Sequence, residues 1–147
     1  MSKTKVLFLC TGNSARSQMA EAYLRHFAGE HFEAHSAGLE PKGINPYTIQ
    51  VMEEIGLSLE GHESKDLRKY LGWVNFGYLI TVSDHAEKNC PTTFLGISQR
   101  EHWSFEDPAA FVGTPEETAA KFRQVRDQMQ NRIFAWLGER GISPSGS

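Results

Sequence analysis

The chain has 147 residues, of which 39% are hydrophobic and 22% charged, a composition typical of one globular domain around a single core. Lys and Arg number 15 against 18 Asp and Glu, for a formal net charge of −3, so no basic excess indicates a nucleic-acid partner. The longest apolar run near the start, residues 6–10, is too short for a signal peptide or a membrane span.

Short apolar runs bounded by turn residues predict strands, and apolar residues recurring every three or four positions predict helices. In chain order, the predicted elements are a strand at 4–9, a helix at 17–28, a strand at 32–36, a helix at 46–55, a short helix within 62–70, a strand at 76–82, a helical turn at 84–89, a short strand at 101–104 and a long helix at 114–137.

Strands that alternate with helices favour an α/β fold with a parallel sheet covered on both faces. We therefore expect one three-layer domain at residues 1–138, followed by a flexible C-terminal tail at 139–147 that is rich in Gly, Ser and Pro. Such sheets bind ligands beyond the carboxyl ends of their strands. The loop after the first strand, residues 10–17, lies at that edge.

This loop reads Cys10-Thr11-Gly12-Asn13-Ser14-Ala15-Arg16-Ser17 and leads directly into a helix. A loop entering a helix points unpaired backbone N–H groups at one spot, and the helix dipole adds positive potential there. The planar cation of Arg16 suits two oxygens of a tetrahedral oxyanion. The same field favours the thiolate of Cys10, to which Ser17 is placed to donate a hydrogen bond. The pattern indicates a nucleophile at the floor of an oxyanion site.

A lone cysteine more often packs as a small hydrophobic residue. We discount that alternative because Cys, Gly, Arg and Ser coincide at one strand-to-helix junction. The loop lacks G-x4-GK[ST] and G-x-G-x-x-G, which argues against nucleotide binding.

The C-x5-R-S form of residues 10–17, with Gln18-Met19-Ala20-Glu21 after it, resembles the low-molecular-weight tyrosine phosphatase superfamily, and within it the arsenate reductase branch. The likeness runs in order from residue 3 to about 137. It implies a four-stranded sheet in the flavodoxin-like order 2-1-3-4 and a small oxyanion substrate (arsenate, phosphate or sulfate). The oxyanion-binding residues that it implies are Thr11, Gly12, Asn13, Ser14, Ala15 and Arg16.

The resemblance also assigns catalytic roles. It makes Cys10 the nucleophile, supported by Ser17, and places a general acid on Asp107, where Pro108 restricts the carboxyl group to an extended backbone. Read without the family, Asp-Pro is usually a turn. The loops expected near the cradle supply only one aromatic residue, Phe111, which favours a small inorganic anion over phosphotyrosine.

Cys90 bears on which of two reactions the protein catalyses, hydrolysis of a phosphate ester or reduction of arsenate. Hydrolysis needs one thiol and water, whereas reduction of arsenate needs a second thiol to take over the bond to Cys10. Many arsenate reductases carry two cysteines here, seven apart; in this chain the second matches Cys90 but the first falls on Ser83. Either Cys90 reaches Cys10 directly, or an external thiol (thioredoxin, glutaredoxin or a low-molecular-weight thiol) resolves it. The alternatives to a reductase are a phosphotyrosine phosphatase and a non-catalytic oxyanion-binding module.

We expect no tightly bound cofactor and no metal. Some relatives hold potassium with the equivalents of Asn13, Glu21 and residues near 62–66, but Lys65 here is suited to replace that cation. With two cysteines and no export signal, we further expect a cytoplasmic monomer without a membrane partner, in a reducing compartment.

Overall fold

A computed structural model describes residues 3–70, 74–90 and 97–145. Within these residues, four parallel strands form one sheet in the order β2-β1-β3-β4, which confirms the predicted fold class and strand order. The strands are β1 (Thr4–Cys10), β2 (Phe32–Gly38), β3 (Phe76–Thr81) and β4 (Ile97–His102). Because β1 pairs with both β2 and β3, its last residue emerges at the centre of the carboxyl edge.

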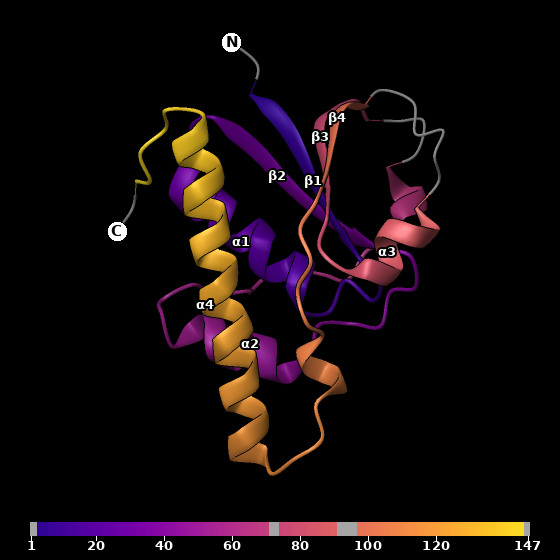
Figure 1. Ribbon diagram of the computed structural model, residues 1–147, viewed down its shortest axis with the longest axis vertical. Coiled ribbons are helices and arrows are strands. Elements are labelled where there is room, and N and C mark those ends of the chain that lie inside the picture. The colour runs from indigo at the N-terminus through magenta and orange to yellow at the C-terminus, as the bar shows by residue number, and fades with distance from the viewer. Residues whose placement is uncertain (1–2, 71–73, 91–96, 146–147) are drawn as a thin grey trace.

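Helices cover both faces of this sheet (Figure 1). On one face lie α1 (Arg16–Ala28), α2 (Pro46–Glu53) and α4 (Pro115–Glu139); on the other lie α3 (Asp84–Asn89) and the 3-10 turn η1 (Leu67–Lys69). A second 3-10 turn, η2 (Pro108–Ala110), precedes α4. Across the described ranges no helix is both long and apolar enough to cross a bilayer.

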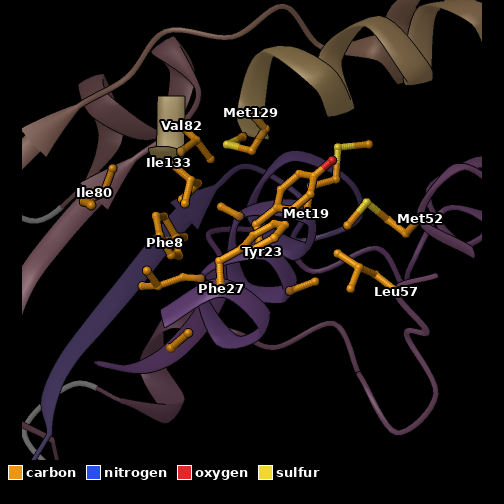
Figure 2. Packing of buried hydrophobic residues seen from close by; sticks show 14 of the residues in the cluster. Phe8, Met19, Tyr23, Phe27, Met52, Leu57, Ile80, Val82, Met129 and Ile133 are labelled. Atoms are coloured by element: carbon orange, nitrogen blue, oxygen red, sulfur yellow. The ribbon is translucent and has the colours of Figure 1, made fainter. Parts of the chain in front are cut away.

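Alternation along β1 divides the core into two clusters, because successive strand residues point to opposite faces. Phe8 belongs to the larger cluster, with Met19 and Tyr23 of α1 and Met129 of α4; Figure 2 shows these side chains packed between the two helices and the sheet. Leu7 and Leu9 belong to the smaller cluster, on the side of α3. Burial of both strand faces explains the unbroken apolar run that predicted β1.

The last strand differs from its prediction. It covers Ile97–His102 rather than 101–104, and it is an edge strand that pairs only with β3. Its sequence, ISQREH, has a single apolar residue, so backbone pairing rather than a hydrophobic pattern defines it. The helix predicted within 62–70 is reduced to the three residues of η1.

One helix end and the C-terminal tail also differ from expectation or add to it. α2 ends at Glu53, and Gly56, expected as its terminator, lies beyond it with a positive φ of 81°. At the C-terminus, the Ser145 backbone N–H donates to the Phe27 carbonyl at 2.8 Å, so the described part of the tail contacts the domain. The flexibility of the tail stays a prediction.

Candidate active site

Residues 10–15 form a loop whose carbonyl groups are turned outward. Backbone N–H groups of residues 39–45 donate to the carbonyls of Cys10, Thr11, Gly12 and Ser14 at 2.8–3.2 Å. Because the N–H and C=O of a peptide unit point in opposite directions, these bonds turn the loop amides inward. Loop and helix α1 therefore present N–H groups toward one point, as expected for an oxyanion site.

The Cys10 thiol lies at the base of this loop and is 2% exposed. Its Sγ accepts a hydrogen bond from the backbone N–H of Asn13 at 3.2 Å and lies 2.8 Å from Ser17 Oγ. Asn13 Nδ2 in turn donates to Ser17 Oγ at 2.8 Å. Since that bond uses a lone pair of the hydroxyl, the proton of Ser17 is free to point at the sulfur. Both contacts favour the thiolate.

Asn13 has a positive φ of 48°, a left-handed conformation that Asn tolerates better than most residues. Its side-chain Oδ1 accepts from the Lys65 backbone N–H at 2.7 Å and from Gln18 Nε2 at 3.0 Å. These bonds fix the amide so that its Nδ2 faces Ser17. The contact of Gln18 with Asn13 could not be predicted from the sequence, because a single Gln in a helical pattern does not indicate which residue it binds.

Arg16 connects the loop to the segment that carries the predicted acid. Its Nη1 donates to the Phe105 carbonyl at 3.1 Å, and its Nη2 lies 3.7 Å from Asp107 Oδ2. Asp107 caps η2 by accepting from the Ala109 backbone N–H at 3.0 Å. The sequence-predicted nucleophile, cation and carboxylate are thus neighbours, although they lie far apart in the chain.

These groups line a pocket of about 470 Å³, which also includes Lys42 and the first residues of α3. His85 stands in its wall with Nδ1 3.1 Å from Thr11 Oγ1. The phenyl ring in the lining is that of Phe105. Phe111, the one aromatic residue of the loops expected nearby, packs under the Lys121 ammonium instead, which lies 5.6 Å from its ring centre. The sequence did not place Lys42, His85 and Phe105 in this lining, because they come from segments far apart in the chain: two loops and the start of α3.

Cys90 does not line the pocket. Helix α3 starts at the expected sheet edge, but Cys90 follows its last turn, is 5% exposed and belongs to the smaller cluster. Cys10 belongs to the larger one. Burial in this apolar setting raises the pKa of the Cys90 thiol, although Arg100 partly offsets the effect.

The residues around Glu21 do not fit a monovalent metal ion. The buried Glu21 carboxylate lies 2.8 Å from Arg25 Nη2 and 3.6 Å from Lys65 Nζ, and it accepts a bond from Ser36 Oγ. Lys65 Nζ also donates to the Glu63 carbonyl at 3.0 Å, so ammonium and guanidinium groups supply the positive charge. In the part of the chain that the structure describes, no three His, Cys, Asp or Glu side chains form a metal cluster.

Comparison with known proteins gives consistent matches. A family model described as low molecular weight phosphotyrosine protein phosphatase matches residues 5–142. An arsenate reductase of Shouchella clausii is 42% identical over 141 residues (95% of this chain, 100% of the relative), and one of Bacillus subtilis is 39% identical over 136 residues (91% and 96%). A solved arsenate reductase in its phosphate-binding state superposes with a TM-score of 0.75 at 27% identity, covering 92% of this chain and 98% of that one.

Proposed function

The chain belongs to the low molecular weight phosphotyrosine protein phosphatase family, and from this premise we propose that it is an arsenate reductase with Cys10 as its nucleophile. The observation that carries the proposal is the Cys10 thiol, which accepts a hydrogen bond from the Asn13 backbone N–H, lies 2.8 Å from Ser17 Oγ and lines a pocket shared with Arg16 and Asp107. The Shouchella clausii and Bacillus subtilis relatives, which match nearly the whole chain, are arsenate reductases.

In the proposed reaction, the loop amides and the Arg16 guanidinium bind the oxygens of arsenate. The Cys10 thiolate attacks arsenic, and Asp107 protonates the oxygen that departs on the opposite side, so that it leaves as water. A second thiol then attacks Cys10 Sγ. The S–As bond breaks, its electron pair stays on arsenic, and As(V) becomes As(III), which leaves as arsenite.

Hydrolysis of a phosphate monoester is the second candidate, because the same Cys10, Arg16 and Asp107 set suits a phosphocysteine intermediate. The pocket favours the reductase. A site for phosphotyrosine is expected to pack aromatic side chains against the phenol ring of the substrate. Of the described residues, only Phe105 contributes a phenyl ring to this lining.

The test compares arsenite release from arsenate, with dithiothreitol as reductant, and hydrolysis of p-nitrophenyl phosphate without it. We expect sustained arsenite release that Cys10→Ser abolishes, and only weak ester hydrolysis. Fast hydrolysis of the ester with no arsenite release would show that the protein acts as a phosphatase and not as a reductase. Inactivity in both assays, with intact folding, would leave an oxyanion-binding module.

A further inference from the structure

The proposed function requires a second thiol, and the pocket that holds Cys10 contains none. At the wall nearest to the loop stands Ser83, whose Oγ lies 3.4 Å from Thr11 Oγ1 and also accepts from the Ala86 backbone N–H, as the cap of α3. A hydroxyl group cannot take part in thiol–disulfide exchange.

The other cysteine of the chain is poorly placed to act. Cys90 packs in the smaller cluster with Leu7, Leu9 and Leu79, while the Cys10 side chain belongs to the cluster on the opposite face of the sheet. The end of β1 therefore separates the two sulfurs. Cys90 would have to leave an apolar site that α3 covers before it reached Cys10.

The pocket has room for an external molecule and a cation to hold it. Its 470 Å³ exceeds the size of one oxyanion, and the Lys42 side chain lies over the loop, since a Cβ on Gly12 would meet Lys42 Cδ at 3.4 Å. The other strong cation of the lining, Arg16, is held by Phe105 and Asp107. Throughout the described ranges, no ion pair involves the Lys42 ammonium, which leaves it open to a negatively charged ligand.

The acidic residues of the lining are already paired. Asp84 accepts from Ser104 and His102 at 2.9–3.0 Å, Glu106 pairs with Lys121 at 2.8 Å, and Asp107 faces Arg16. An anionic group entering on the side of Lys42 thus meets an unpaired positive charge rather than an unpaired carboxylate.

Resting on the proposed function, we propose that the second thiol comes from a low-molecular-weight thiol that carries a carboxylate, binds in this pocket and pairs with Lys42. Its sulfur attacks Cys10 Sγ, arsenite leaves with the electron pair of the S–As bond, and a mixed disulfide between Cys10 and the small thiol forms. A second molecule of the thiol attacks that disulfide, which restores the Cys10 thiol and releases the oxidised small disulfide. Two thiols and one arsenate give one disulfide, one arsenite and water.

The first experiment is a single turnover of the reduced wild-type protein with arsenate and no added thiol. We expect no stoichiometric arsenite, and, after glutathione is added, arsenite together with a Cys10–glutathione disulfide detected by peptide mass spectrometry. Cys90→Ala should behave the same. One arsenite per protein without added thiol, accompanied by a Cys10–Cys90 disulfide, would overturn the proposal while leaving the reductase standing.

The second experiment tests the contact with Lys42. Lys42→Glu should raise the KM for glutathione about tenfold and change the KM for uncharged 2-mercaptoethanol less than twofold. Lys88→Glu is the matched control, because Lys88 is an exposed lysine that does not line the pocket. An equal effect of Lys42→Glu on both thiols, or turnover supported only by a protein dithiol such as thioredoxin, would overturn the proposal. Absence of arsenite with every thiol would instead remove the proposed function.

Discussion

The hydroxyl of Ser17 lies 2.8 Å from the thiol of Cys10 while it accepts a hydrogen bond from the Asn13 side-chain amide. Because the hydroxyl oxygen accepts from the amide, its own proton is available for donation to the sulfur. Asn13 and Ser17 thus form a hydrogen-bond chain that ends at the proposed nucleophile, Cys10.

Ser17→Ala should slow the reaction of Cys10 with arsenate by about 10- to 100-fold, since it removes one charge-assisted hydrogen bond worth about 1.5–3 kcal/mol. The measurement is the initial rate of arsenite release at saturating thiol. Ser58→Ala, on an exposed loop, is the control and should leave the rate unchanged. A Ser17→Ala rate within twofold of wild type would show that Ser17 does not stabilise the Cys10 thiolate.

Asp107→Asn should lower the turnover number by about 100-fold or more, because the departing oxygen loses its proton donor. The KM for arsenate should change much less, since the loop amides and Arg16 bind the anion. Steady-state kinetics checks both values. Glu106→Gln, one residue away on the same loop, is the control. A loss confined to KM would show that Asp107 acts in binding instead.

Gly38→Ala should abolish oxyanion binding. A Cβ at this position would lie 2.8 Å from the Asn13 backbone nitrogen and the Thr11 carbonyl oxygen. The backbone of the oxyanion loop would therefore have to shift, which would disturb the amides that bind the anion. Phosphate titration followed by calorimetry measures the loss.

Gly138→Ala in α4 is the matched control for this substitution, because nothing lies within 4 Å of its Cβ position. It should raise stability by about 0.5–1 kcal/mol through helix propensity, with phosphate binding intact. Normal phosphate binding by Gly38→Ala would contradict the packing described here.

Glu54 should stabilise the fold in a pH-dependent way. The hydrogen bond from Arg123, and to a smaller extent the one from Arg126, lowers the pKa of Glu54 to about 2, below its ordinary 4.5. A lowered folded-state pKa gives stability that is present above pH 4.5 and is lost as the pH falls through about 2. Glu54→Gln should therefore melt below wild type at pH 7, with the difference vanishing near pH 2. A constant difference would exclude the ionised pair as its cause.

Patterns local in the chain predicted most of this molecule. Apolar periodicity predicted β1, α1 and α4, because each buries a continuous face, and the coincidence of Cys10, Arg16 and Ser17 at one junction predicted the base of the site. β4 was misplaced because an edge strand needs few apolar residues. Contacts between distant segments were out of reach: nothing local places Cys90 on the far face of the sheet or Lys42 over the loop.

The state of the Cys10 thiol is tested most directly by labelling the two cysteines with iodoacetamide at pH 7, followed by peptide mass spectrometry. We predict that Cys10 is alkylated rapidly, that arsenate or phosphate blocks this reaction, and that Cys90, with its raised pKa and its burial, reacts only on unfolding. Slow labelling of Cys10 that is indifferent to either anion would contradict the central claim that its thiolate lies at the base of an oxyanion site.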